Sequence, residues 1–404
     1  MQKLHRITLC CFIGLFLSCN ALYAEPRVKI SSTAVTLSEG ITDAMLDEIA
    51  KAQFEGEPSF SLRDVHSPED MAKLCAAFPQ MTALEISSDE LSSIEPLAAL
   101  KNLTSLEISA DSLKDFSPLA GLTKIRELKI ESEAMGPDLK WMRDMTQIEK
   151  VSISGGDSLV SLEGIPALPN LRQAEFCEAP IGDLAPIAVL TNLKELKLSD
   201  CKLPDLTPLT ALAHLEKVSF YGSRVKDFSP LAKCPGLKKL DYYGTTGAEY
   251  STLGKLTQLE VLEGGLTNLE DISWISNLSN LKSFNVFSEK VTDYTPLTAI
   301  QLENFEIWSM KVPVGDLGFL SKMTSLNELT LKEIHGATNL EALGGLENLK
   351  TLELIKINVD GGETIPLAAL KKLPQLSWLT LSEGIFTEEE LTGFANPDLS
   401  ISQR

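Results

Sequence analysis

Histidine and cysteine are scarce in this chain, and their scarcity excludes several kinds of site. Of 404 residues only four are histidine and seven are cysteine, and three of the cysteines lie within the first 19 residues. The other four are too few and too scattered for a disulfide framework, and their spacing matches no zinc motif. We therefore expect buried free thiols, no metal and no cofactor. These four are Cys75, Cys177, Cys201 and Cys234.

Catalytic motifs are missing as well. The sequence contains no G-x-S-x-G elbow, no Walker loop and no H-E-x-x-H. The four histidines lie far apart along the chain, in positions that do not converge. The two glycine pairs in segments 154–156 and 263–265 are interpreted as turns rather than phosphate cradles. The sequence therefore predicts a protein that is not an enzyme.

Positive charge is in deficit. Lysine and arginine number 36 against 56 aspartates and glutamates, so the formal net charge is −20. This excess argues against a nucleic-acid partner and against attraction to anionic lipid. It is compatible with a basic protein or peptide partner, and equally with solubility alone.

Long hydrophobic runs are limited to one stretch, from Ile7 to Leu17, which follows a short basic start and precedes small residues. This layout is typical of a secretory signal peptide over residues 1–24, with cleavage after Ala24. Alternatively, the segment "FLSC" resembles a lipoprotein signal in which Cys19 is acylated. Either way, we expect an exported chain, either periplasmic, secreted or on the cell surface, that touches a membrane only through a lipid on Cys19.

What the sequence has in abundance is a repeat. Apolar-x-apolar pairs recur at intervals of about 22 residues. Between them recurs a motif such as "KDFSPLAGL" (114–122) or "PDLTPLTAL" (204–212). The pairs are Leu84/Ile86, Leu106/Ile108, Leu128/Ile130, Val151/Ile153, Ala174/Phe176, Leu196/Leu198, Val218/Phe220, Leu240/Tyr242, Leu262/Gly264, Phe284/Val286, Phe305/Ile307, Leu329/Leu331, Leu352/Leu354 and Leu379/Leu381.

Each pair predicts a short strand with one buried face, and strands that recur once per coil stack into a parallel sheet. In the return segment an Asp or Ser side chain can accept hydrogen bonds from free amides, and Pro begins a short helix or 3₁₀ turn. One coil cannot bury its leucines alone, so its stability depends on the neighbouring coils.

This pattern resembles leucine-rich repeats, in particular the 22-residue bacterial subclass of the internalins, over residues 80–382. The resemblance implies an α/β solenoid, a horseshoe with the parallel sheet on its concave face and short helices or 3₁₀ turns on the return segments. One feature departs from the family: its inward asparagine, five residues after the first strand leucine, is replaced. We therefore expect differently capped turns at Asp89, Asp111, Glu133, Ala179, Cys201, Ser223 and Thr245.

The ends predict caps that cover the exposed core. Residues 25–79 contain two coils with true helices, for which Thr42 and Ser67 are N-cap candidates and Pro68 is the first helical residue. Residues 383–404 repeat that form, with a capping box of Thr387 and Glu390 and a closing strand at 399–401. We expect about sixteen or seventeen coils in one elongated domain.

The most informative positions are those that face the concave side. The residue after each second apolar position is small and polar in the first coils and becomes aromatic in the later ones. We call Tyr221, Tyr243, Phe287 and Trp308 the aromatic column, with Gly265 between its two halves. Asp241, Glu263 and Glu306 are expected to form an acidic rim beside it.

Aromatic side chains make good interface anchors at low entropic cost. The sequence therefore predicts a module that binds a protein or peptide on its concave face, and the resemblance to internalins implies adhesion or host interaction. Two alternatives stay open: a structural envelope protein without a discrete ligand, and a carbohydrate or peptidoglycan binder that stacks sugars on the rings.

Overall fold

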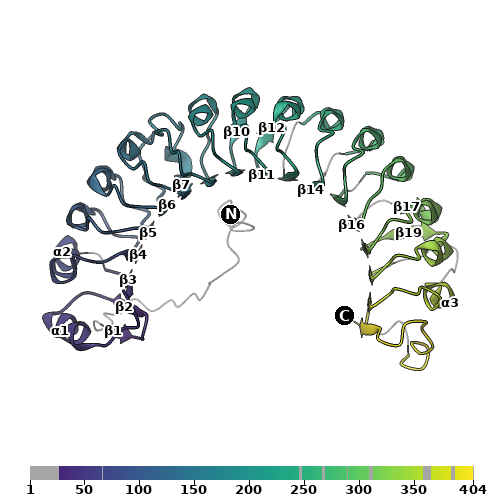
Figure 1. Ribbon diagram of the computed structural model, residues 1–404, viewed down its shortest axis with the longest axis horizontal. Coiled ribbons are helices and arrows are strands. Elements are labelled where there is room, and N and C mark those ends of the chain that lie inside the picture. Colours follow the sequence, from purple (N-terminus) through teal and green to yellow (C-terminus); the bar gives the residue numbers. More distant parts are fainter. Residues whose placement is uncertain are drawn as a thin grey trace, which may run out of the picture.

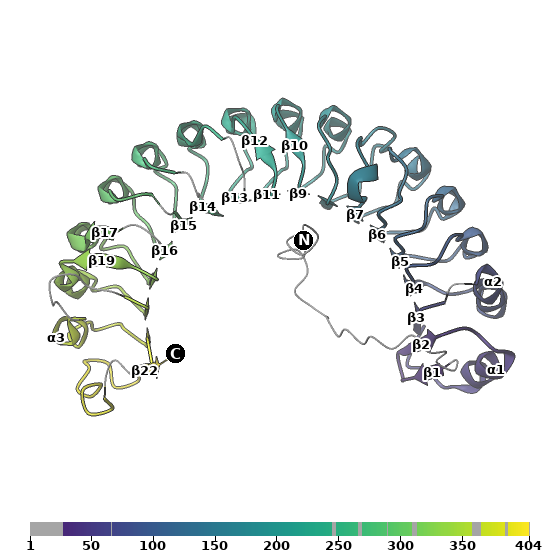
Figure 2. The same ribbon diagram turned by 180° about the vertical axis from the view of Figure 1, so that it is seen from behind.

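A computed structural model describes residues 27–65, 67–244, 248–265, 269–288, 290–308, 313–357, 365–383 and 387–403. The predicted signal peptide, Cys19 included, lies outside these residues, as does His66. The chain forms a horseshoe whose strands line the inner edge and whose helices lie on the outer edge (Figure 1). The view from behind shows the same arrangement (Figure 2). The predicted leucine-rich-repeat solenoid is confirmed.

The concave face is an 18-stranded sheet in which every strand except β1 runs parallel to its neighbours. The register advances one coil per strand, so that Leu84 pairs with Leu106 and Leu106 with Leu128. The strands of this sheet are β1 Arg27–Ile30, β2 Ala34–Ser38, β3 Ser59–Arg63, β4 Ala83–Ser87, β5 Ser105–Ser109, β6 Glu127–Glu131, β7 Lys150–Ser154, β8 Gln173–Cys177, β9 Glu195–Ser199, β11 Lys217–Tyr221, β13 Lys239–Tyr243, β14 Val261–Gly265, β15 Ser283–Phe287, β16 Asn304–Trp308, β18 Glu328–Lys332, β20 Thr351–Ile355, β21 Trp378–Leu381 and β22 Ser400–Gln403.

Two short parallel ladders lie outside this sheet. One pairs β10 (Lys202–Leu203) with β12 (Arg224–Val225), and the other pairs β17 (Pro313–Asp316) with β19 (His335–Thr338). They join neighbouring coils just beyond the carboxyl ends of the main strands, and they give those coils a second line of backbone hydrogen bonds.

The convex side consists mostly of 3₁₀ helices, and several of them begin at the recurring Asp-x-Ser/Thr-Pro motif. In each motif the Asp accepts a hydrogen bond from the amide two residues later, for example Ser117 N to Asp115 Oδ1 at 2.8 Å. The next leucine then points inward, as does the fully buried Leu119. The helices are η1 Glu95–Ala99, η2 Ser117–Gly121, η3 Lys140–Met142, η4 Gly156–Ser158, η5 Ala185–Val189, η6 Thr207–Ala211, η7 Ser229–Lys233, η8 Tyr250–Lys255, η9 Ser273–Asn277, η10 Thr295–Ala299, η11 Leu317–Lys322, η12 Leu340–Gly345 and the α-helical turn α3 Leu367–Leu370.

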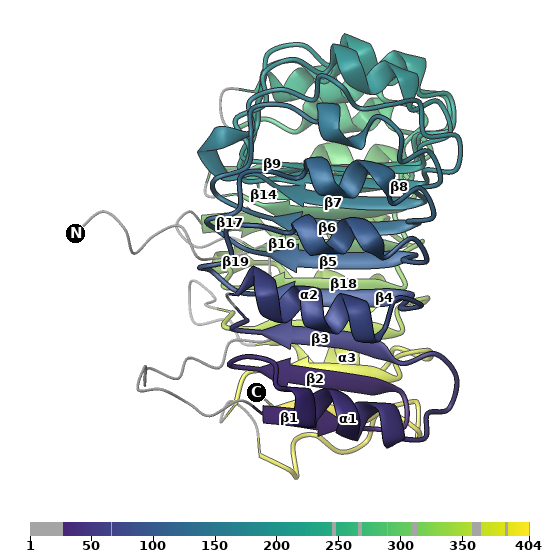
Figure 3. The ribbon, with the colours of Figure 1, turned by 90° about the vertical axis from the view of Figure 1, so that its left-hand side faces the viewer.

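The N-terminal coils carry the two predicted α-helices, stacked below the repeats in the side view (Figure 3). Thr42 caps α1 (Asp43–Lys51) and Ser67 caps α2 (Pro68–Ala77), each accepting from a backbone amide at 3.3 Å. One element was not predicted: β1 folds back antiparallel on β2 and closes the open edge of the sheet.

The C-terminal cap differs from the prediction in one respect. The capping box is present, because Thr387 N donates to Glu390 Oε2 at 2.8 Å and Glu390 N donates to Thr387 Oγ1 at 3.3 Å. It closes only a turn, however, and no helix follows among the described residues 387–403. The closing strand is confirmed as β22, in which Ile401 pairs with Leu379.

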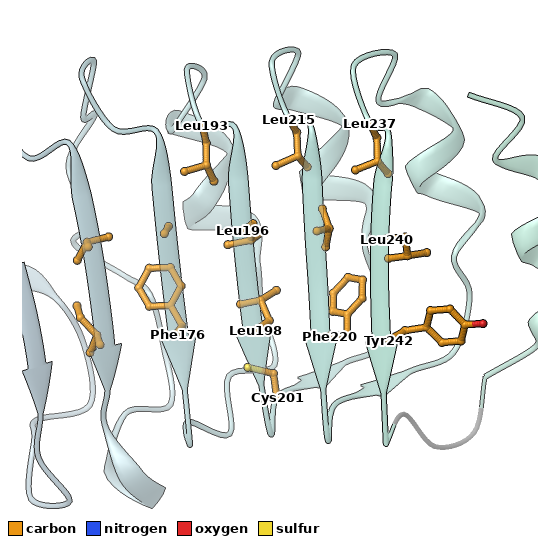
Figure 4. Packing of buried hydrophobic residues seen from close by; sticks show 14 of the residues in the cluster. Phe176, Leu193, Leu196, Leu198, Cys201, Leu215, Phe220, Leu237, Leu240 and Tyr242 are labelled. Carbon is orange, nitrogen blue, oxygen red and sulfur yellow. The ribbon is translucent and has the colours of Figure 1, made fainter. Parts of the chain in front are cut away.

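A single core runs through the stack of coils. Figure 4 shows the inward strand side chains in rows, with Leu196 and Leu198 beside Phe220, Leu240 and Tyr242. The four cysteines among the described residues are buried free thiols, as expected. Burial raises the thiol pKa of Cys201 to about 12 and that of Cys75 to about 11.

The turns after the strands are capped in two ways. The sequence analysis placed the inward residue five positions after the first strand leucine, but in the early coils it lies one residue earlier. In the early coils Asp89, Asp111 and Glu133 are exposed, and the residue before each of them faces inward instead; Ser132 there donates to Leu113 O at 2.7 Å. From the coil of β8 onward, several strands are followed by one residue with positive φ, such as Asp200 or Gly222. This extra residue turns the following one inward, which is why Ala179, Cys201 and Ser223 are buried. Thr245 lies outside the described residues.

The pair Gly264 and Gly265 is not a turn, as the sequence had suggested, but ends strand β14. A Cβ placed on Gly264 would lie 2.5 Å from Cζ of the fully buried Tyr242 ring in the neighbouring strand. Only glycine leaves room for that ring, so the large inward residue of one coil is matched by the smallest in the next.

We predict that Gly264→Ala destabilises the fold by about 1–3 kcal/mol, because the buried Tyr242 ring has no space into which to move. Urea unfolding measures the effect. Gly265→Ala is the matched control, since its Cβ would meet Tyr243 and Phe287 at ordinary contact distances of 3.6 and 3.7 Å. If Gly264→Ala and Gly265→Ala unfold at the same urea concentration, the interpretation is wrong.

The return segments also predict a dependence of stability on pH. Hydrogen bonds from residues two positions later lower the pKa of Asp205, Asp227 and Asp293 below the ordinary 3.8. Since the folded state prefers the ionised form, this stabilisation is present above about pH 4 and is lost as the pH falls through the lowered pKa values.

We therefore expect the free energy of unfolding to fall between about pH 4 and pH 2. A variant with Asn at all three positions keeps the oxygen acceptors but not the charges, so its stability should depend less steeply on pH. Urea titrations at several pH values compare the two slopes. Parallel slopes would show that these carboxylates do not contribute.

Candidate binding surface

The aromatic column crosses five neighbouring strands of the concave face, with Gly265 at its centre. Tyr221 pairs with Tyr243, Tyr243 with Gly265, Gly265 with Phe287, and Phe287 with Trp308. Each is the last residue of its strand, on the side away from the buried second and fourth residues. Because adjacent strands lie about 4.8 Å apart, these side chains stand next to one another across five strands.

The rings contact each other in two pairs. Those of Tyr221 and Tyr243 are stacked, with centroids 5.6 Å apart and planes 10° from parallel. Those of Phe287 and Trp308 meet edge to face at 5.3 Å. The Lys197 ammonium lies over the Tyr221 ring, 5.4 Å from its centroid. The two tyrosines and Phe287 are partly buried and Trp308 is 39% exposed, so the column presents apolar surface to solvent.

The acidic rim is only partly as expected. Glu263 and Glu306 face solvent, with side chains 30% and 29% exposed. Asp241, by contrast, has a side chain only 3% exposed, so it is a buried anion rather than part of an exposed rim. It accepts from Ser219 Oγ at 2.9 Å, and the ammonium groups of Lys217 and Lys239 lie 3.2 and 3.4 Å away.

The sequence analysis did not predict the ion pairs made by the lysines of this face. They alternate with carboxylates on neighbouring strands: Lys239 pairs with Glu263 at 2.8 Å, and Lys332 with Glu306 at 3.5 Å and with Glu353 at 3.4 Å. Farther along, Lys197 pairs with Glu175. Opposite charges one coil apart signal these pairs, because equivalent positions become neighbours once the register is known.

Within the described ranges no group of three or more His, Cys, Asp and Glu side chains could hold a metal ion. His214 and His335 lie in separate coils, the latter at the start of β19. The part of the chain that the structure describes also contains no helix long and apolar enough to cross a membrane.

Asp241 occupies an outward position of its strand, yet its buried carboxylate should contribute to the stability of the fold. We predict that Asp241→Ala destabilises the fold by about 1–3 kcal/mol, because it leaves Ser219 without its acceptor and sets two lysines against each other. Thermal unfolding measures the loss. Glu263→Ala, which removes an exposed partner of Lys239, is the control and should cost less than about 1 kcal/mol. Equal losses would contradict the structural role of Asp241.

Comparison with known proteins adds the fold family. No family model matches the sequence, and no curated protein matches it either. Among solved structures, an internalin of Listeria monocytogenes is similar over 81% of this chain and 88% of its own, with 22% identity and a TM-score of 0.57. A leucine-rich-repeat protein of Leptospira interrogans is similar over 90% of this chain and 92% of its own, with 15% identity and a TM-score of 0.62. At these identities the likeness concerns the fold alone, and that fold is a leucine-rich-repeat solenoid.

Proposed function

We propose that this chain is an exported, non-enzymatic module that recognises a protein or peptide on its concave face. The aromatic column is the observation that carries the proposal. A monomeric surface ordinarily buries such residues, whereas here four large rings stand side by side on the open sheet. The lysines and carboxylates that alternate beside these rings supply the polar surroundings of an interface.

The geometry of the rings favours a polypeptide over a carbohydrate. A sugar stacks on an open ring face. One face of Tyr221 is covered by Lys197 and its other face by Tyr243, and Phe287 meets Trp308 edge to face. Tyr221 therefore presents its edge and hydroxyl group to solvent, which suit side chains and backbone of a protein partner. The one uncovered face of Tyr243 borders only the narrow gap at Gly265.

Export is the second part of the proposal, and it is supported by the basic start, apolar run and small residues of segment 1–24. Cleavage after Ala24 and acylation of Cys19 both deliver the horseshoe outside the cytoplasm. In the acylated form the lipid holds the solenoid at a membrane surface, where its concave face stays open to a partner.

The test is a capture experiment with the whole chain immobilised and exposed to a surface-protein extract and, separately, to peptidoglycan fragments. A variant with Ser at Tyr221, Tyr243, Phe287 and Trp308 should lose at least about ten-fold of the protein captured, because aromatic anchors dominate interface energy. Circular dichroism verifies that the variant is folded.

The control removes exposed apolar surface elsewhere. Val160 and Val189 are 50% and 45% exposed and lie outside the strands of the sheet, so their change to Ser should leave capture unchanged. Identical capture by native chain and aromatic variant would sink the proposal in favour of a structural envelope protein. Retention of peptidoglycan alone would favour the carbohydrate alternative.

A further inference from the structure

The aromatic column is interrupted at Gly265, and the interruption is a slot with a ring on each side. A Cβ placed on Gly265 would lie 3.6 Å from Tyr243 Cδ1 and 3.7 Å from Phe287 Cδ1. These are ordinary van der Waals distances, so the space between the two rings above Gly265 is about one atomic layer wide. We call this space the Gly265 slot.

The slot is flanked by a face of Tyr243 and by the Phe287 ring, and each of these rings contacts a further ring. Tyr221 and Tyr243 are stacked with planes 10° from parallel, so the second face of Tyr243 is turned toward Gly265. On the far side, Phe287 is fixed by its edge-to-face contact with Trp308. Both walls are therefore backed by a second ring, and the slot is set before any ligand arrives.

The charge around the slot is negative. The outward positions of the five strands of the column, β11 to β16, carry three carboxylates, Asp241, Glu263 and Glu306, and two lysines, Lys217 and Lys239. Asp241 pairs with both lysines and Glu263 with Lys239, while Glu306 pairs with Lys332 of the next strand. One carboxylate is left in excess, and Glu263 lies on the strand of Gly265 itself, two residues earlier on the same face.

The pKa of the Tyr243 hydroxyl is raised in part by the same carboxylates. Burial raises its pKa first, and the negative charges of Glu263, Asp241 and Glu306 raise it further. At Tyr221 the lysines Lys197 and Lys239 oppose this effect. The pKa of Tyr221 is still raised, so carboxylates act on both tyrosines, and lysines offset them only at Tyr221.

The chain already shows that a cation suits this stack of rings, because the Lys197 ammonium covers the outer face of Tyr221. At the opposite end of the tyrosine pair, the equivalent ring face of Tyr243 borders the position that a Cβ on the buried Gly265 would occupy. The two ends of the tyrosine stack are chemically alike, and only one carries its cation within the chain.

We propose that the Gly265 slot binds the guanidinium group of an arginine side chain from the polypeptide partner, stacked between Tyr243 and Phe287 and paired with Glu263. A guanidinium is planar, one atomic layer thick and permanently charged, and it pairs with a carboxylate in its own plane while both faces lie on rings. A lysine ammonium matches the charge but not the shape. This inference rests on the proposed function and specifies the partner.

The experiment uses three blocked pentapeptides that differ at the central residue of Gly-Gly-X-Gly-Gly, where X is arginine, citrulline or lysine. Citrulline keeps the planar shape of arginine and lacks its charge. Saturation-transfer NMR with the whole chain measures binding of each peptide. We expect the arginine peptide to bind about ten-fold more tightly than the citrulline peptide, and more tightly than the lysine peptide.

Two variants locate the effect. Gly265→Val fills the slot and keeps every ring and charge, so it should abolish the arginine preference. Glu263→Gln keeps the shape and removes the charge, so it should bring arginine and citrulline peptides together. Ser109→Val is the matched control: it places the same side chain at the equivalent position of β5, remote from the slot, and should change nothing.

The outcomes separate this inference from the proposed function. Equal binding of arginine and citrulline peptides, binding unaffected by Gly265→Val, or no binding by the native chain would each overturn the arginine slot. Protein capture through the aromatic column that persists in Gly265→Val would remove the slot and leave protein recognition standing. If the native chain bound no peptide and its protein capture did not depend on the aromatic column, both proposals would be wrong.

Discussion

Lateral stacking of coil on coil is the constraint on which the whole structure depends. The inward leucines of one coil lie in a row with those of the next and are fully buried, as Leu196, Val218 and Leu240 are. No coil has enough residues to cover its own apolar side chains, so the chain must repeat its strands in register and then close both ends. The β1 hairpin and the C-terminal turn with β22 provide that closure.

Stacking of the coils determines the inward residues, but it does not determine which residues face outward on the concave side. Because side chains alternate along a strand, the outward positions contribute nothing to the buried rows, and the strand spacing brings equivalent positions of adjacent coils into contact. Whatever residues occupy one column must therefore interact: rings with rings at Tyr221 and Tyr243, lysine with carboxylate at Lys239 and Glu263. A binding surface can thus be composed on this fold without altering it.

Features that depend on local sequence or on the repeat could be predicted, and features that depend on contacts between coils could not. The strands, the aromatic column and the caps at Thr42, Ser67 and Thr387 were predictable, because each depends on residues close in sequence or on the repeat itself. The burial of Asp241 was not, since it arises from Lys217, Lys239 and Ser219, which become its neighbours only in the folded sheet. The extra positive-φ residue after β8 was missed for a similar reason: Glu178 carries no glycine-like signal.

The two adjacent glycines of β14 show how one strand serves both faces. Gly264 points inward and yields its space to the ring of Tyr242, so its role lies in the core. Gly265 points outward and separates Tyr243 from Phe287, so its role lies on the surface. Had Gly265 been a fifth aromatic residue, the column would be a closed stack whose ring faces cover one another. Its absence of a side chain is what opens a ring face, next to carboxylates, to a planar cation from outside.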